Sequence, residues 1–160
     1  KYVYSHFGYN LKATDLQASI GCAQLLKFPD FARRRRENFV RLKAGLAGTE
    51  GRLILPEACP NSDPSWFGFL ISCEAGIDRA KLVRHIEARG VQTRMLFAGN
   101  LTKHPCFDEM RRSGEGYRVV GELPVTNRIM RDTFWVGVYP GMTDEMIDYM
   151  AQTIREGLLL

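Results

Sequence analysis

The sequence has 160 residues, 45% of them apolar, and a formal net charge of +4. A chain of this length can bury enough surface for one ordinary domain. Its longest apolar runs, 66–72 and 134–138, are far shorter than the roughly 20 residues that a membrane helix needs, so we expect no membrane-spanning segment. The four cysteines are scattered and form no CxxC pair, which favours reduced thiols in a cytoplasmic protein.

The most visible positive charge is the run of four arginines at 33–36. Glu37 follows at once and no aromatic residue is interleaved, which favours a solvated or subunit-facing helix and predicts no nucleic-acid partner. The sequence opens on an aromatic stretch, without an initiator methionine or a signal-like start. We therefore expect the chain to be part of something longer.

A first helix is predicted to begin at Thr14, because the stretch from Thr14 to Gln17 has the capping-box pattern. Three apolar residues recur at helical spacing and are expected to form one buried stripe: Leu16, Ile20 and Ala23. Pro29 predicts the end of this helix at about residue 27 or 28. A second helix is predicted from residue 30 to about residue 46, with an apolar face formed by Phe31, Phe39, Leu42 and Leu46.

Strands and helices are predicted to alternate in the rest of the chain. The aromatic-rich stretch 66–72 predicts a central strand, and 91–95 and 134–138 predict two more. Asp78 is expected to cap a helix that ends at Gly90, with Leu82, Val83 and Ile86 facing inward. Thr143 is expected to cap a last helix, whose apolar residues are Met146, Ile147, Met150 and Ile154. This order indicates an α+β fold with helices over a small sheet.

The connection 98–121 is long and punctuated by glycine and proline, so we expect it to line a site or to contact a partner. Candidate ligand-binding groups lie in glycine-flanked or apolar loops: Asn10, Arg94 and Asn100. Arginine suits phosphate or carboxylate, and asparagine suits a sugar hydroxyl. The alternative is that the asparagines only cap turns. The three histidines are far apart and predict no metal site.

Four stretches resemble the DegT/DnrJ/StrS aminotransferase family and, within it, the sugar 3-dehydrase branch. They are YVYSHFGYNLKATDLQA (2–18), SWFGF (65–69), TRMLFAGN (93–100) and TFWVGVYPG (133–141). The resemblance implies the small C-terminal domain of a fold-type I pyridoxal phosphate (PLP)-dependent transferase. It would have helices packed on a small, mainly antiparallel sheet, preceded by two helices. Residues 1–50 would be a helical segment leading from a large cofactor-binding domain, and 51–160 would be the small α+β domain.

The activity that the resemblance implies is loss of the C3 hydroxyl from CDP-4-keto-6-deoxyglucose, in the synthesis of lipopolysaccharide dideoxysugars. The complete enzyme would use PLP or pyridoxamine phosphate (PMP) and, in the CDP-sugar branch, an iron–sulfur cluster. Its implied partners are a nucleotide-sugar substrate, a second copy in a homodimer and a flavin-containing iron–sulfur reductase. One alternative is a portion of a GDP-4-keto-6-deoxymannose 3-dehydrase, and another is a non-catalytic remnant or interaction domain.

The resemblance also assigns roles to individual residues. Asn10 would reach the cofactor phosphate of the neighbouring subunit. Phe67 matches a position where aminotransferase members carry histidine, which favours dehydration over amine transfer. Arg94, Phe97 and Asn100 would form a substrate-facing loop. The family's catalytic histidine or lysine and its cofactor-binding aspartate match no residue here, so we expect no catalytic residue in this chain, and no cofactor or cluster bound to it alone.

Overall fold

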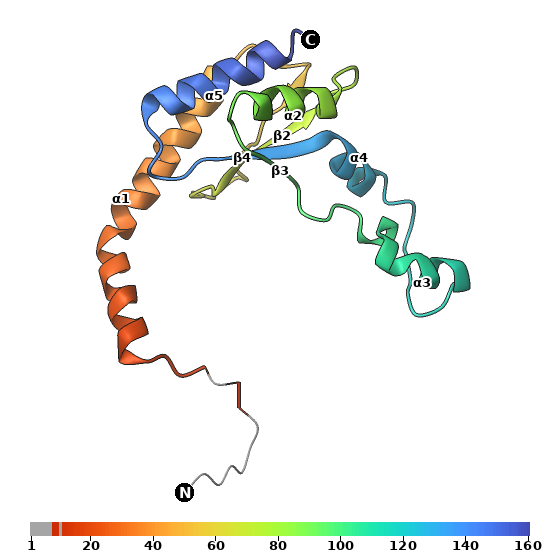
Figure 1. The fold of residues 1–160 in the computed structure, drawn as a ribbon, viewed down its shortest axis with the longest axis horizontal. Coiled ribbons are helices and arrows are strands. Elements are labelled where there is room, and N and C mark those ends of the chain that lie inside the picture. Colours follow the sequence, from red (N-terminus) through yellow and green to blue (C-terminus); the bar gives the residue numbers. More distant parts are fainter. Residues whose placement is uncertain (1–7, 10) are drawn as a thin grey trace, which may run out of the picture.

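The computed structural model describes residues 8, 9 and 11–160, and Figure 1 shows their arrangement. The helices are α1 (Asp15–Gly45), α2 (Arg79–Ala88), α3 (Asp108–Ser113), α4 (Pro124–Asp132) and α5 (Asp144–Gly157), and two short 3₁₀ turns span Leu101–Lys103 and Pro105–Phe107. The strands are β1 (Leu53–Ile54), β2 (Gly68–Cys73), β3 (Thr93–Met95) and β4 (Thr133–Gly137). The α+β class is confirmed. None of the helices in this described part is long and apolar enough to cross a membrane.

The sheet has the order β1-β2-β4-β3, and every pairing is antiparallel. All three strand predictions are confirmed, and β2 is central as expected. Side chains alternate between the two faces, since successive residues of a strand point to opposite sides. On the core face, Phe69 pairs with Val136 and Ile71 pairs with Phe134, and all four side chains are fully buried.

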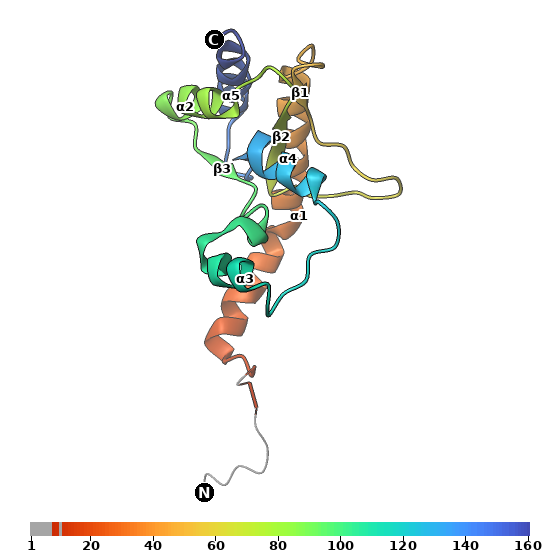
Figure 2. The same ribbon diagram turned by 90° about the vertical axis from the view of Figure 1, so that its right-hand side faces the viewer.

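Helices α1, α2 and α5 cover this core face (Figure 2). The fully or almost fully buried side chains of this layer are Leu42, Leu82, Ile86, Ile147 and Ile154, together with Leu46 directly after α1. Burying a leucine or isoleucine side chain is worth roughly 1.5–3 kcal/mol, so this layer supplies much of the stability. The caps at Asp78 and Thr143 are confirmed. Of the apolar residues expected on the last helix, Ile147, Met150 and Ile154 are buried, whereas Met146 is about half exposed.

The prediction of two N-terminal helices is wrong, because α1 is one continuous helix of 31 residues that contains Pro29. Its predicted capping box is confirmed: Gln17 N donates to Thr14 Oγ1 at 3.3 Å, and Thr14 N donates to Gln17 Oε1 at 3.0 Å. A proline removes one hydrogen bond of a helix, and the turns on either side keep theirs. The second half of α1 is further fixed by Phe39 and Leu42, which are buried in the core.

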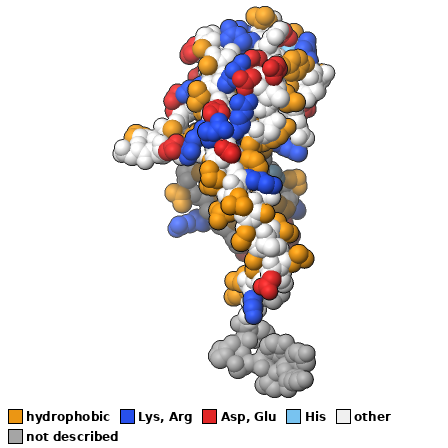
Figure 3. Space-filling view, turned by 90° about the vertical axis from the view of Figure 1, so that its left-hand side faces the viewer, with side chains coloured by type: hydrophobic (Ala, Val, Ile, Leu, Met, Phe, Trp, Pro, Cys, Tyr) orange, Lys and Arg blue, Asp and Glu red, His pale blue; other side chains and the backbone are white. Residues whose placement is uncertain are grey.

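The first half of α1 extends away from the sheet (Figures 1 and 2). Leu16 and Ile20 are 75% and 58% exposed, so the stripe predicted to be buried is not covered by any of the residues from 11 onward. Apolar side chains are visible along this part of the helix in Figure 3. Helical spacing predicts which side chains share a face, but burial also needs an opposing element.

Ion pairs join α1 to the first turns of α5. Arg34 Nη2 lies 2.6 Å from Asp144 Oδ1, and Arg41 reaches both Asp144 at 2.9 Å and Asp148 at 2.6 Å. Interspersed positive and negative side chains are visible on this side of the molecule in Figure 3. Carboxylates near a helix N-terminus are also favoured by the helix dipole. Part of the arginine run is therefore used inside the chain.

Gly68 should not tolerate even one methyl group. A Cβ at Gly68 would lie 2.6 Å from Cε3 of Trp135, whereas a Cβ at its strand partner Gly137 would meet nothing within 4 Å. We expect Gly68→Ala to lower the free energy of unfolding by about 1–3 kcal/mol, the usual cost of overpacking. Urea unfolding checks this, with Gly137→Ala as the matched control. Equal stabilities of the two variants would contradict the packing described here.

The contact between Arg41 and α5 should depend on pH. The hydrogen bond from Arg41 lowers the pKa of Asp148 in the folded protein. A carboxyl with a lowered pKa contributes stability above its unfolded-state pKa and loses it as the pH falls through the folded-state pKa. We therefore expect Arg41→Gln to reduce Tm more at pH 7 than at pH 2.

Thermal melts of Arg41→Gln at both pH values check this prediction. Arg33→Gln is the control, because the ion-pair partners of Arg33, Asp30 and Glu37, lie on the same helix. A Tm difference for Arg41→Gln that stays the same from pH 7 to pH 2 would show that the pair with Asp148 contributes nothing.

Candidate functional site

The face of the sheet opposite the core carries an aromatic pair. We call this the open face. Trp135 lies at its centre, directly opposite Leu70 of β2 and Arg94 of β3. The ring of Phe67 packs against that of Trp135, with the centroids 4.8 Å apart and the planes at 52°. The absence of a side chain at Gly68 gives the Trp135 ring its place.

Phe67 is 63% exposed, so its ring is available to a ligand or to another part of a protein. Trp135 is more deeply placed, and its Nε1 donates a hydrogen bond of 3.1 Å to the carbonyl oxygen of Met95. That bond fixes the end of β3, from which the loop 96–100 leaves. The sequence analysis places Trp135 only in a strand and assigns it no role in a site. Its packing over Gly68 of β2 becomes visible only in the structure.

Phe97 projects from this loop in an unusual backbone conformation. Its φ is +46°, and its side chain is 77% exposed. A residue other than glycine rarely adopts positive φ, and such conformations cost on the order of 1–3 kcal/mol and cluster at functional sites. An exposed aromatic side chain does not offset this cost by burial. The surrounding contacts must therefore hold the loop.

Phe97 itself and the two residues that follow it in the loop make these contacts. The Phe97 amide donates to Met95 O at 2.7 Å, and Nε2 of His104 lies 2.6 Å from Ala98 O. Gly99 lies against Met130 of α4 so closely that a Cβ would be 2.6 Å from Cγ of Met130. The long connection thus folds back on its own start.

Asn100 completes the set of contacts that fix the loop. It is only 3% exposed, and its Oδ1 accepts from Thr102 N at 3.1 Å and from Thr102 Oγ1 at 2.7 Å. Its Nδ2 donates to Oδ1 of Asn127 in α4 at 2.8 Å. This is the geometry of the turn-capping alternative. The substrate-facing role of Asn100 stays a prediction, and the observed bonds give it a structural role in the loop.

Arg94 is exposed on the open face, and its guanidinium makes no hydrogen bond or ion pair with any residue that the structure describes. It lines a cavity of about 520 Å³ together with Trp135, Tyr139 and Tyr149. The structure therefore brings Phe67 and Arg94 to the two sides of Trp135, with Phe97 in the loop that follows β3. Asn10 lies outside the described residues.

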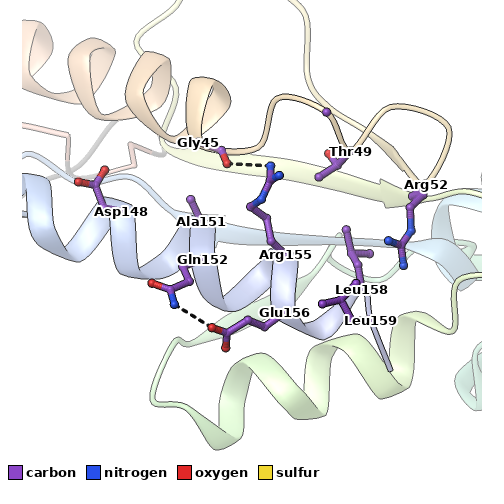
Figure 4. A pocket seen from close by; sticks show the side chains of 11 residues that line it. Gly45, Thr49, Arg52, Asp148, Ala151, Gln152, Arg155, Glu156, Leu158 and Leu159 are labelled. Carbon is purple, nitrogen blue, oxygen red and sulfur yellow. Dashed lines mark hydrogen bonds between the residues drawn. The ribbon is translucent and has the colours of Figure 1, made fainter.

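A second cavity, of about 510 Å³, lies between the end of α1 and α5 (Figure 4). Arg155 projects into it and donates to the carbonyl oxygens of Gly45 at 3.3 Å and Ala47 at 2.7 Å. The last carbonyls of a helix lack intrahelical partners, so Arg155 acts as a helix-end contact. None of the predicted site residues that the structure describes lines this cavity.

Other reactive groups are few in the described ranges. No cluster of three or more histidine, cysteine or acidic side chains could hold a metal ion in this part of the chain. Cys73 is buried, and burial raises its pKa to about 11. A thiol with that pKa holds almost no thiolate at neutral pH and is a poor nucleophile.

Comparison with known proteins identifies the class. Residues 1–155 match the model of the DegT/DnrJ/EryC1/StrS aminotransferase family, and the chain belongs to this family. A solved aminotransferase, TlmJ from Streptoalloteichus hindustanus, superimposes with a TM-score of 0.81 at 27% identity over 99% of this chain and 40% of that one. A GDP-4-keto-6-deoxymannose-3-dehydratase with a trapped PLP–glutamate geminal diamine has the same fold, with a TM-score of 0.79 at 23% identity, over 96% of this chain and 38% of that one.

Two relatives are much more similar in sequence. The dTDP-4-dehydro-2,6-dideoxy-D-glucose 3-dehydratase of Saccharopolyspora spinosa is 51% identical over 98% of this chain, which spans 33% of the relative. The lipopolysaccharide biosynthesis protein RfbH of Salmonella typhimurium is 49% identical over 98% of this chain, which spans 35% of it. The chain thus spans about a third of the length of these relatives. Its similarity to the sugar-dehydratase branch of the family is confirmed.

The described residues that line the cavity beside Trp135 do not by themselves fit a PLP-type cofactor. Such a group needs a phosphate site, a partner for its ring nitrogen and a base. The cavity beside Trp135 has Arg94 as a possible phosphate ligand, but no lysine, histidine or carboxylate is among the described residues that line it. The reacting end of the cofactor would have to be held by other residues.

The Asn127–Asn100 bond should control the order of the Phe97 loop. We expect Asn127→Leu to leave the Asn100 amide buried without its acceptor, which costs about 1–3 kcal/mol, and to speed hydrogen exchange at the Thr102 amide. Asn127→Asp is the matched control, because it keeps an acceptor oxygen. Exchange at Thr102 that is unchanged in Asn127→Leu would show that the loop is held by other contacts.

Proposed function

We propose that this chain is the substrate-facing small domain of a nucleotide-sugar 3-dehydratase in polysaccharide biosynthesis. The observation that carries the proposal is the exposed Phe97, held at positive φ by hydrogen-bonded contacts next to the Phe67–Trp135 pair. Two relatives of about 50% identity support the sugar-dehydratase reading, one being a sugar 3-dehydratase by name and the other a lipopolysaccharide biosynthesis protein.

We propose CDP-4-keto-6-deoxyglucose as the substrate, with a dTDP-linked 4-keto sugar as the second candidate. The dTDP candidate is favoured by the 51% identity to a dehydratase whose name specifies a dTDP sugar. The GDP-linked alternative has weaker support, since the GDP-4-keto-6-deoxy-D-mannose 3-dehydratases of Escherichia coli and Yersinia pseudotuberculosis are 25% and 29% identical.

In the complete enzyme, PLP or PMP would supply the electron sink for loss of the C3 hydroxyl. The part of this chain would be to bind and enclose the sugar nucleotide. Arg94 presents a planar fork of donors that suits a phosphate, and the apolar rings of Phe67 and Phe97 exclude water. By the resemblance, Phe67 matches a position where aminotransferase members carry histidine, so an aromatic ring there is in keeping with dehydration rather than amine transfer.

The remaining partners belong to the same proposal. Asn10 would bind the cofactor phosphate of a second copy in a cytoplasmic homodimer. An iron–sulfur cluster held elsewhere in the enzyme and a separate flavin-containing reductase would serve the reduction that follows in the CDP-sugar branch. The 49% identity to RfbH, a lipopolysaccharide biosynthesis protein, supports the pathway of this proposal.

The rival from another class is a non-catalytic interaction domain. The exposed apolar side chains on the first half of α1 favour it, because exposed apolar surface of this kind marks contacts with another protein surface. In a dehydratase, the same surface would pack against the rest of the enzyme. Conversion of a 4-keto sugar nucleotide by a protein containing this chain would support the dehydratase hypothesis over the interaction-domain hypothesis.

The test uses the natural gene product that contains this chain, supplied with PMP and, in separate reactions, the CDP-, dTDP- and GDP-linked 4-keto-6-deoxy sugars. We expect mass spectrometry to show loss of water from the CDP or the dTDP sugar. Phe97→Ala should lower kcat/KM by roughly tenfold, the effect of losing about 1.4 kcal/mol of contact in the transition state.

Val120→Ala is the control for Phe97→Ala, because Val120 is an exposed apolar residue of the same long connection but is not part of the loop 96–100. It should leave kcat/KM unchanged. Formation of an amino sugar, or conversion of none of the three sugars, would refute the dehydratase proposal.

A further inference from the structure

The cavity beside Trp135 is lined by apolar and aromatic side chains together with two polar ones, Gln92 and Arg94. It lies where β3, the end of β4 and α5 meet, and the side chains that matter here are Gln92, Arg94, Trp135, Tyr139 and Tyr149. Three of the five are aromatic. Arg94 is the one charged group among the described residues that line this space. We call this cavity the aromatic groove.

Gly137 gives the aromatic groove its depth. It lies two residues after Trp135 in β4 and therefore on the same face of the sheet, which Arg94 shares through its pairing with Trp135. A Cβ at Gly137 would meet no atom within 4 Å. The end of the strand thus faces open space, and a flat group can approach the backbone there.

Two of the aromatic rings are held by their polar ends. Trp135 Nε1 donates to Met95 O at 3.1 Å, and the Tyr149 hydroxyl donates to Arg89 O at 3.0 Å. Both donors are therefore used within the protein, and what remains for a ligand is the apolar surface of the rings. Because these bonds restrict the rings before a ligand arrives, stacking on them costs little further ordering.

We infer that the aromatic groove binds the nucleoside diphosphate part of the substrate. The base would stack on the aromatic rings, the Gln92 amide would hydrogen-bond to the edge of the base, and Arg94 would bind the phosphates. A sugar ring alone would need several hydroxyl-binding groups, and this lining offers few. The inference rests on the proposed function, since it assigns one part of the same substrate to a place in the fold.

The test measures binding without turnover. CDP, cytidine and inorganic pyrophosphate are each titrated into the ¹⁵N-labelled chain, and NMR shift changes are followed at the Trp135 indole and at the amides of Gln92 and Gly137. We expect CDP to shift these signals, cytidine to shift them with lower affinity, and pyrophosphate to affect mainly the region of Arg94. Absence of shifts with CDP, or shifts confined to the cavity of Figure 4, would overturn the inference.

Variants separate the contributions of ring and charge. Tyr149→Ala should weaken CDP and cytidine alike, by about tenfold for one lost stacking contact. Arg94→Gln should weaken CDP but not cytidine, whereas Arg52→Gln, which removes an arginine from the other cavity, should change neither. Gly137→Val should block the groove while keeping the thermal stability. CDP affinity that is unaffected by Tyr149→Ala and Gly137→Val would show that the ligand lies elsewhere.

The inference about the groove and the proposed function can be refuted separately. If the protein removes water from a sugar nucleotide but CDP does not bind in the aromatic groove, the dehydratase proposal stands and the inference about the groove is wrong. Conversely, CDP binding in the groove without water loss would establish a nucleotide site in a protein with another activity.

Discussion

The antiparallel pairing of β2 with β4 is the constraint on which the rest of this structure depends. It places Phe69 beside Val136 and Ile71 beside Phe134 on one face, where three helices bury them. The same register necessarily places Leu70 beside Trp135 on the other face. A slip of one residue would exchange the two faces, moving the tryptophan into the core and the core phenylalanines out of it. Fold and candidate site are therefore set by one pairing.

The open face shows how a small domain can present apolar groups to a ligand. Trp135 is bonded to the end of β3 and packs over Gly68, so it is fixed by both neighbouring strands. The loop that follows β3 then presents Phe97 at positive φ, and α4 holds this loop through Asn127 and Met130. Rigid elements thus support residues that are themselves exposed, which is how precise binding sites are generally built.

Local patterns were enough to predict much of the fold. Alternating aromatic and apolar residues located β2 and β4, and the side-chain chemistry of Thr14, Asp78 and Thr143 located three helix starts. The prediction that α1 ends at Pro29 was wrong, because the packing of the helix's second half outweighs the one hydrogen bond that Pro29 removes. Local sequence rules do not include this packing. The prediction that the stripe containing Leu16 is buried was wrong for a related reason, since burial depends on an opposing surface as well as on helical spacing.

The candidate site was less accessible to sequence reasoning. Phe67 and Phe97 were named through a family resemblance, whereas Arg94 was already a candidate from its side-chain chemistry. The structure adds the geometry that relates Phe67 and Arg94 to Trp135. The sequence around Asn100 is compatible with a ligand contact and with a turn cap. Only the observed hydrogen bonds of Asn100 with Thr102 and Asn127 show that it caps the turn. Contacts between residues distant in sequence, such as that of Gly99 with Met130, cannot be predicted from a local sequence pattern.

The central claim is that the open face of this sheet meets the sugar nucleotide. A crystal structure of the complete natural protein with a bound, unreactive 4-keto sugar nucleotide tests it most directly. The account predicts ligand atoms in van der Waals contact with the Phe97 ring and within hydrogen-bonding distance of the Arg94 guanidinium. A structure in which protein alone covers Phe97 and Arg94, with the ligand bound elsewhere, would contradict it.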